Sequence, residues 1–220
     1  MKNKILLDNI TLNDEELFLE NEYIKEISAS GTCVINLFKC NIMDLKINVT
    51  DNSSLTINYF NIIDEKDTNI TITVNDKSSC TLNHSFINNH KYNLNIYTDF
   101  LKEEGTIKVN IHGINDSGKL TTNVNGYVKT EKINNYLDEN IRIINLNNGE
   151  VTSNPNMYID TSKVIANHNT TIGNIRLDEL FYLMSKGLDK EESTRLITKG
   201  FLIKIISNNE IKTKISEILN

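Results

Sequence analysis

The chain has 220 residues, 39% hydrophobic and 24% charged, which fits one globular domain with a small appendage. Its formal net charge of -6, without a basic stripe, argues against a nucleic-acid partner. No apolar run approaches the roughly 18 residues of a membrane span, and no signal peptide precedes the acidic stretch from Asp14, so we expect a cytoplasmic protein without a membrane partner.

The first predicted element is a helix between Thr11 and Ser30. Thr11 followed by Asp14 is an acceptable helix start. The apolar residues fall roughly on one helical face: Leu12, Leu17, Phe18, Tyr23, Ile24 and Ile27. We therefore predict an N-terminal helical segment within residues 1–30, before the period changes after Gly31.

A second region, residues 31–173, alternates apolar and polar residues as half-buried strands do. The clearest alternating segments are Leu45–Val49, Leu55–Tyr59, Ile70–Val74, Cys80–Asn83, Tyr92–Ile96, Ile107–Ile111 and Leu120–Val124. Their centres lie about 10 to 15 residues apart, with clusters of Asn, Asp, Ser and Lys between them. This region is predicted to be the β-rich core of the protein.

The strand spacing is compatible with an antiparallel sandwich and with a parallel β-helix. Two features favour the β-helix. The chain contains 35 asparagines, many at outward positions where Asn and Thr side chains could stack in ladders on successive rungs. With one proline and nine glycines there are few signals for tight hairpins, whereas Asn tolerates the left-handed turns that a parallel coil needs.

The period becomes helical again in residues 174–220. An apolar stripe that contains Leu177 and Met184 ends at Gly187, a typical C-terminal stop. Asp189 and Glu192 then form a capping pair for a second helix, and a third helix is predicted from Glu210 to Leu219. Residues 176–220 carry a net charge of +1 against -7 for the rest, so the tail is chemically distinct.

Searches for catalytic motifs return little: the chain has no phosphate-binding glycine loop, no nucleophile elbow and no zinc-protease helix. Asp64, Glu65 and Asp67 form a tight acidic group, but in a turn-like segment where a solvated loop is expected and not a glycosidase site. We predict that the protein is not an enzyme.

The candidate metal-ligating residues are few. Cys33, Cys40 and Cys80 have spacings that match neither a disulfide framework nor a zinc knuckle, so we expect half-buried free thiols on strands. Acceptance of sulfur or binding of a metal by one of them is the alternative. Of the four histidines, those at 84, 90 and 112 are expected at surface or strand-edge positions. His168 lies at the junction of the strand region and the helical tail.

The stretch from Tyr158 to Phe201 contains the strings VIANHNTTIG, DELFYLMSKGLDKEE and LITKGF. These strings resemble the C-terminal signature of the SufB/SufD family of iron–sulfur cluster assembly proteins. The matching residues are His168, Thr170, Gly173, Leu180, Phe181, Tyr182, Gly187, Glu191, Glu192, Gly200 and Phe201. A weaker likeness extends back through SGKLTTNVNGYVKT.

The resemblance implies a right-handed parallel β-helix flanked by helices, acting as a scaffold with no catalytic residues. It also implies that the C-terminal helices dock an ABC-type ATPase similar to SufC. A second SufB- or SufD-like subunit would pair along the β-helix, giving a homodimer or heterodimer with a transient iron–sulfur cluster at the interface. His168 is the position of the candidate cluster and metal ligand. The expected docking residues are Leu177, Leu180, Phe181, Tyr182, Met184, Gly187, Leu188, Glu192, Leu196, Gly200 and Phe201.

Two departures bring the chain closer to SufD than to SufB. SufB-like proteins carry an acidic residue directly after the histidine, where this chain has Asn169. They also carry a cysteine on an upstream strand, and the stretch near Asn140 contains none. The alternative to a cluster scaffold is a β-helical structural or binding module in which the tail only caps the coil.

Overall fold

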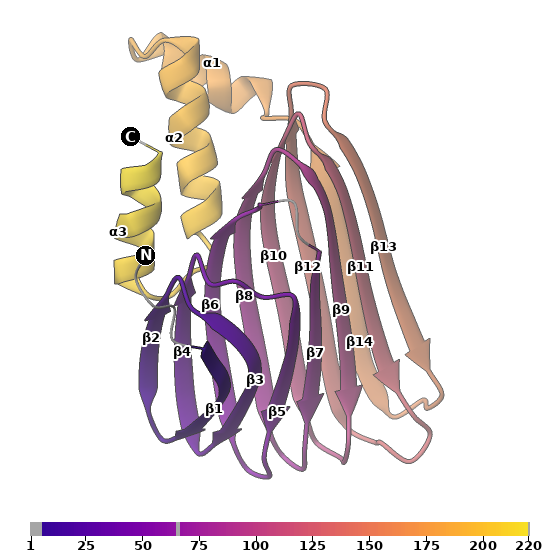
Figure 1. Cartoon of the computed structure of the whole chain (residues 1–220). Coiled ribbons are helices and arrows are strands. Elements are labelled where there is room, and N and C mark those ends of the chain that lie inside the picture. Colours follow the sequence, from indigo (N-terminus) through magenta and orange to yellow (C-terminus); the bar gives the residue numbers. More distant parts are fainter. Residues whose placement is uncertain (1–5, 65–66, 220) are drawn as a thin grey trace.

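The computed structural model describes residues 6–64 and 67–219, which form fourteen strands followed by three helices (Figure 1). The strands are β1 (Leu6–Asn13), β2 (Glu16–Glu20), β3 (Tyr23–Ser30), β4 (Thr32–Phe38), β5 (Asp44–Val49), β6 (Ser54–Ile62), β7 (Thr68–Val74), β8 (Ser79–Asn88), β9 (Lys91–Phe100), β10 (Thr106–Asp116), β11 (Lys119–Val128), β12 (Asn135–Leu146), β13 (Glu150–Ile159) and β14 (Val164–Gly173). The helices are α1 (Leu177–Ser185), α2 (Lys190–Ile203) and α3 (Asn209–Ile218).

The strands form two sheets that face each other. The odd-numbered strands make one seven-stranded sheet, here the odd sheet, and the even-numbered strands make the other, the even sheet. Each strand pairs in parallel with the strand two positions away in the chain, as in β10 with β8 and β12. The chain therefore alternates between the sheets and advances by one rung per pair of strands. This confirms the predicted parallel β-solenoid and excludes the antiparallel sandwich.

The predicted N-terminal helix is wrong, because residues 6–30 form β1, β2 and β3 within the same solenoid. The apolar residues of this segment serve strand pairing, with Ile10 opposite Ile27 and Leu12 opposite Ala29. Turns interrupt the apparent helical face, and Asp14 there has a φ of 50°. Pairing between distant strands outweighs a local pattern that fits either period.

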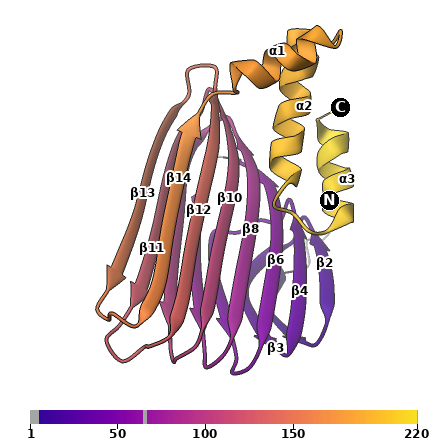
Figure 2. The same cartoon turned by 180° about the vertical axis from the view of Figure 1, so that it is seen from behind.

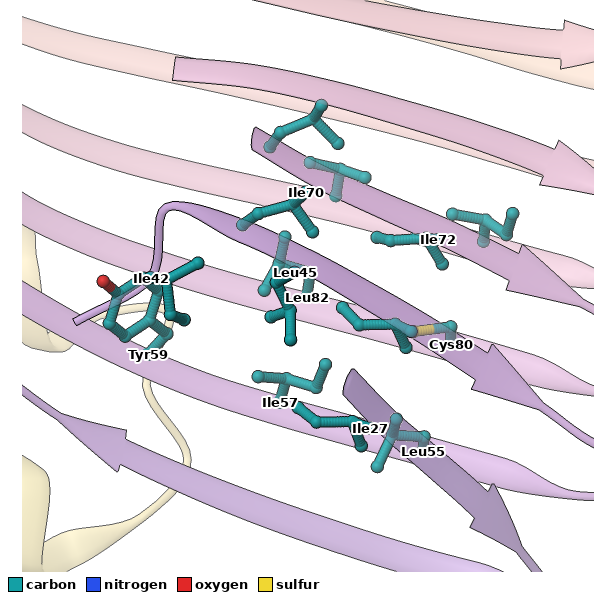
Figure 3. Close-up of a cluster of buried hydrophobic side chains, with 14 of the residues drawn as sticks. Ile27, Ile42, Leu45, Leu55, Ile57, Tyr59, Ile70, Ile72, Cys80 and Leu82 are labelled. Atoms are coloured by element: carbon teal, nitrogen blue, oxygen red, sulfur yellow. The ribbon is translucent and has the colours of Figure 1, made fainter. Parts of the chain in front are cut away.

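The space between the sheets is filled by inward-pointing apolar side chains (Figure 3). Successive rungs place like residues above one another, as Leu55 pairs with Cys80 and Ile57 with Leu82. Every second residue of a strand points inward, so the alternation seen in the sequence becomes a continuous core. At about 25 cal/mol per Å² of buried apolar area, this core is the main source of stability.

Asparagine ladders run along the outer faces, as the sequence predicted. On the even sheet, the side-chain Nδ2 of each asparagine donates a hydrogen bond to the Oδ1 of the asparagine one rung earlier, at 2.9 to 3.3 Å. The members of this ladder are Asn36, Asn58, Asn83 and Asn110. On the odd sheet, Asn69, Asn95, Asn123 and Asn154 form a second ladder at 2.8 to 2.9 Å. Such ladders satisfy polar side chains between rungs and fix the register of the coil.

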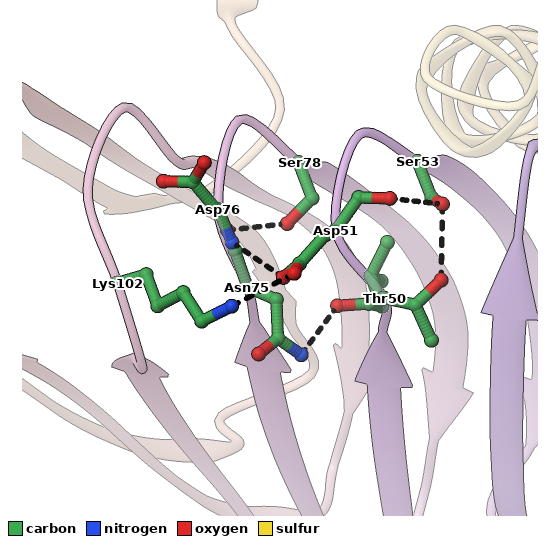
Figure 4. Close-up of polar contacts among 8 residues, drawn as sticks. Thr50, Asp51, Ser53, Asn75, Asp76, Ser78 and Lys102 are labelled. Atoms are coloured by element: carbon green, nitrogen blue, oxygen red, sulfur yellow. Dashed lines mark hydrogen bonds and ion pairs between the residues drawn. The ribbon is translucent and has the colours of Figure 1, made fainter.

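The turns are also stacked and hydrogen-bonded. Figure 4 shows three of them, where Asp51 accepts a hydrogen bond from the Asp76 amide at 3.2 Å and contacts the Lys102 ammonium at 2.7 Å. Asparagines supply the left-handed conformations expected of them, at Asn21, Asn52, Asn134, Asn147 and Asn148.

Helices α2 and α3 lie against the outer face of the even sheet (Figure 2). Leu202 from α2 and Ile211 and Ile215 from α3 are buried there against Phe38 and Phe60. All three predicted helices are confirmed, including the Asp189–Glu192 capping box. Among the described residues, no helix has the length and apolar character needed to cross a bilayer.

Candidate functional site

The last turn of the solenoid, formed by β13 and β14, is here called the open end. Each of these strands pairs with one neighbour, β11 or β12, and no described strand lies beyond them. Both strands also carry exposed apolar side chains on their outer faces, notably Tyr158 and Ile165, which are 51% and 62% exposed. An edge with free backbone groups and apolar side chains is suited to pairing with another strand.

His168 lies on β14 at this open end. Its side chain is exposed, and it shares strand parity with Val164 and Ala166, which pack against the core. The imidazole therefore belongs to the inward-facing row and is exposed because no further rung covers it. In register, His168 stands next to Glu139 of β12.

Glu139 is buried inside the solenoid, one rung before His168. It lies between the core residues Leu137 and Ile141 on the inward side of β12. Neither carboxylate oxygen has a hydrogen-bond partner. Burial, and secondarily the negative charge of Asp138, raises the pKa of Glu139 to about 7. Sequence alternation could have found this residue, since it is a carboxylate at an inward position.

The Glu139 carboxylate extends toward Gly126 on β11 of the opposite sheet. A Cβ added to Gly126 would lie 3.0 Å from Oε1 of Glu139 and 3.4 Å from Oγ1 of Thr98. The missing side chain at position 126 thus makes room for Leu137, whose Cδ2 would lie 2.3 Å from the added Cβ, and for Glu139. Thr98 Oγ1, on β9, is also buried without a partner, as is Thr170 Oγ1 on β14. Three unpartnered polar side chains, Thr98, Glu139 and Thr170, therefore lie in the interior of the last three turns, in addition to His84 in the middle of the solenoid.

A second candidate surface is the groove between α1 and α2, with a volume of about 510 Å³. The groove is lined by Asp178, Glu179, Tyr182, Leu183, Leu196, Ile197 and Gly200. The α1 side chains Leu177, Phe181 and Tyr182 are at least 60% exposed. Large exposed apolar side chains on a rigid helical hairpin are typical of protein-binding sites.

Most of the predicted docking residues are exposed, and four of them have structural roles. Exposed members are Leu177, Phe181, Tyr182, Met184, Gly187, Glu192, Leu196 and Gly200, with Leu188 half-buried. Leu180 is buried, and Phe201 is half-buried against the solenoid. Gly187 adopts a φ of 98° and ends α1, while Glu192 completes the cap of α2. These last four residues hold the hairpin in shape and in place.

His112, which the sequence placed at a surface or strand edge, anchors α2 to the even sheet. Its ring stacks on Phe201 with centroids 4.3 Å apart, and its Nδ1 lies 2.7 Å from the Phe201 carbonyl oxygen. Burial lowers the pKa of His112. His84 is also misplaced by the sequence prediction, because it is fully buried inside the solenoid.

The three cysteines are free thiols, fully buried in the core and not half-buried as predicted. Burial raises the pKa of Cys40 to about 11 and that of Cys80 to about 12. The thiols of Cys40 and Cys80 therefore stay protonated near neutral pH and are poor nucleophiles. Among the described residues, no cluster of three or more His, Cys, Asp or Glu side chains is arranged to hold a metal ion.

The acidic group predicted in a turn lies where it was expected, as far as it is described. Asp64 and Asp67 fall between β6 and β7, and Glu65 lies outside the described residues. Asp67 accepts hydrogen bonds from the backbone and side chain of Asn93.

The described residues form a parallel β-solenoid with an unpaired last turn and an exposed C-terminal helical hairpin. The family model of the SUF system FeS cluster assembly SufBD core domain matches residues 39–201. The chain therefore belongs to this family, as its sequence signature indicated.

Three similar proteins carry names of the same family. An iron–sulfur cluster assembly protein SufD of Bacillus subtilis is 38% identical over 60 residues, which cover 27% of this chain and 14% of the relative. A SufBD family protein of Pyrococcus horikoshii is 57% identical over 35 residues, or 16% and 8% of the two chains. A Mycobacterium leprae SufBD family protein is 35% identical over 69 residues, or 31% and 18%. Each match spans less than a fifth of the relative.

Proposed function

We propose that the protein is a non-catalytic scaffold subunit in cytoplasmic iron–sulfur cluster assembly. Its α1–α2 groove binds a SufC-like ABC ATPase, and its open end pairs with a second scaffold subunit, either another copy or a SufB-like chain. A nascent cluster is bound at that interface as cargo, with His168 as one ligand. Membership of the SUF assembly family supports this function, and the exposed surfaces support the assignment of partners.

The observation that carries the proposal is the direct connection between the two surfaces. β14 ends at Gly173 and α1 begins at Leu177, so three residues separate the strand with His168 from the exposed hairpin. Ile175 in this linker is almost fully buried. A displacement of the hairpin by an ATPase would therefore act on the open-end strand through a short, packed connection.

ATPase docking is tested with substitutions in the groove. A Cβ added at Gly200 would have no neighbouring atom within 4 Å, so Gly200→Val fills the groove without a clash inside the chain. We expect Gly200→Val and Phe181→Asp each to weaken binding of the cognate ATPase roughly 30-fold, the effect of a hot spot worth about 2 kcal/mol. Leu101→Asp, at an exposed apolar residue away from the helices, is the matched control. Wild-type binding by both groove variants would refute the docking site.

Pairing through the open end is tested separately. Ile165→Lys places a charge on the exposed edge strand β14, and Tyr97→Lys places one on the outer face of β9 as a control. Native mass measurement of the chain co-expressed with the ATPase should show loss of the second scaffold subunit with Ile165→Lys alone. Retention of that subunit would place the pairing surface elsewhere.

The same assembly decides between the scaffold and a β-solenoid module without a role in cluster assembly. Anaerobic reconstitution with iron and sulfide should give iron–sulfur absorbance in the complex, reduced by His168→Ala. A complex that forms normally but never acquires that absorbance would favour the module.

A further inference from the structure

The interior of the solenoid changes from apolar to polar along one row of the even sheet. The register aligns Leu82, Val109, Glu139 and His168 on β8, β10, β12 and β14. The facing row of the odd sheet aligns Ile72, Thr98, Gly126 and Met157. In this row of the even sheet, the inward side chains are therefore apolar at Leu82 and Val109 and polar at Glu139 and His168, and His168 lies at the open end.

Glu139 is the fully buried ionisable group in this row, and its carboxylate has no partner among the described residues. Burying an unpaired carboxylate is costly, and cores keep such a group only where a proton, a cationic side chain or a metal ion neutralises it. No Lys or Arg forms an ion pair with Glu139 among the described residues.

His168 supplies a second donor next to that carboxylate. The two residues are register partners on adjacent parallel strands, with side chains on the same side of the sheet. Neighbouring strands lie about 4.8 Å apart. A metal ion about 2.1 Å from each donor atom spans donors up to about 4 Å apart, a separation that side chains on neighbouring strands can reach by a change of rotamer. Imidazole with carboxylate suits iron(II) and other divalent first-row metals.

We propose that Glu139 and His168 together bind one divalent transition-metal ion, iron(II) in the working complex, from inside the open end of the solenoid. The exposed imidazole faces the opening and the carboxylate lies beneath it. Water or groups of the facing subunit complete the coordination, because this chain offers two donors at the position. The inference rests on the proposed function in taking His168 as a metal ligand, and it assigns Glu139 a role that the sequence signature does not include.

Anaerobic titration of the full chain with Co²⁺ tests the site, because the visible absorption of Co²⁺ reports its nitrogen and oxygen ligands. The variants are Glu139→Gln, Glu139→Ala and His168→Ala. Asp138→Asn is the matched control, since Asp138 precedes Glu139 but points outward and accepts a hydrogen bond from Asn140 at 3.1 Å. We expect one Co²⁺ per wild-type chain and a roughly tenfold or greater loss of affinity in all three site variants. Asp138→Asn should bind as the wild type does.

The outcomes separate this inference from the proposed function. Unchanged Co²⁺ binding by both Glu139 variants, with loss in His168→Ala, would overturn the role of Glu139 and leave His168 as a ligand. No Co²⁺ binding by the wild-type chain, or equal binding by all variants, would overturn the whole site while ATPase docking is judged by its own test. Thermal melts monitored by circular dichroism verify folding, and Glu139→Gln should fold because it removes a buried charge.

Discussion

Two parts of the solenoid interior hold an unpartnered ionisable side chain, and they treat it in opposite ways. In the middle turns, the ring of His84 on β8 stacks on Tyr59, with ring centroids 4.4 Å apart. The ring of Phe86 lies beside it, at 5.2 Å between centroids. In the last turns, Glu139 faces the bare backbone of Gly126 and the hydroxyl of Thr98. Both ionisable groups are fully buried without hydrogen-bond partners.

The two groups differ in whether they are neutral at physiological pH. Burial lowers the pKa of His84 to about 3, so the imidazole is neutral and acts as one more aromatic ring. Burial raises the pKa of Glu139 to about 7, so a substantial fraction carries an uncompensated charge near neutrality. A buried histidine among aromatic rings can therefore be purely structural, whereas the buried carboxylate near the opening is the group that the proposed metal site uses.

The largest expected effect comes from removing the middle-turn imidazole. Between pH 6.5 and about 3, the unfolded chain protonates His84 and the native chain does not, so stability falls as pH falls. By pH 4 this contribution amounts to roughly 3 kcal/mol. His84→Phe removes it, and urea unfolding at pH 7 and pH 4 should show a smaller acid loss in the variant. Equal losses in the two proteins would show that the imidazole is not buried neutral.

Glu139→Gln, in the metal-free chain, tests the opposite pH dependence, a loss of stability as pH rises. The native pKa lies above the unfolded value of about 4.5, so the native state holds the proton more tightly and stability falls as pH rises through about 7. The wild type should lose about 2 kcal/mol between pH 5 and pH 8 that the variant retains. Urea unfolding at both pH values measures this, with Glu103→Gln, at an exposed glutamate of a turn, as control. A variant that is less stable than the wild type at pH 8 would contradict the unpaired carboxylate.

Gly126→Ala tests the room that the missing side chain leaves for Leu137 and Glu139. The added Cβ would lie 2.3 Å from Cδ2 of Leu137 and 3.0 Å from Oε1 of Glu139, so the variant should be destabilised by about 1–2 kcal/mol. Gly173→Ala is the control, because a Cβ there has no atom within 4 Å, and its effect should stay within about 0.5 kcal/mol. Equal unfolding midpoints for the two variants would mean that the last turns are loosely packed.

Much of this architecture could be predicted from the sequence because a solenoid repeats local rules. The alternation of apolar and polar residues predicted strands such as β9 and β10 and which of their side chains point inward. Asp189 predicted the start of α2, and Gly187 predicted the end of α1. The N-terminal segment failed because its apolar spacing fits two periods, and pairing with later strands decided between them. That pairing is not visible in a local window.

The sites were predictable only in part. The family signature pointed to His168 and to the terminal helices, but not to which face of each helix contacts the solenoid. Leu180 and Phe181 are neighbours in sequence, yet one is buried and the other is 60% exposed. Thr98 and Gly126, which lie near Glu139, are on β9 and β11 of the other sheet, so their convergence depends on the stacking of rungs.

The smallest expected effect distinguishes orphaned from satisfied hydroxyls in the last turns. Thr98 Oγ1 is buried without a partner, whereas Thr122 Oγ1 donates to Ser153 Oγ at 2.8 Å. Thr98→Val removes a desolvated hydroxyl that gains nothing in return, so stability should rise slightly, by up to about 1 kcal/mol. Thr122→Val removes a made hydrogen bond and should cost about 1 kcal/mol.

The sign of this difference is the informative quantity, and unfolding midpoints of the two variants measure it. Both threonines point into the same core and the substitution is the same, so packing changes largely cancel between them. A loss of stability in Thr98→Val would mean that its hydroxyl has a partner, such as an ordered water shared with Glu139. The carboxylate would then be solvated inside the coil, and its demand for a metal ion would be correspondingly weaker.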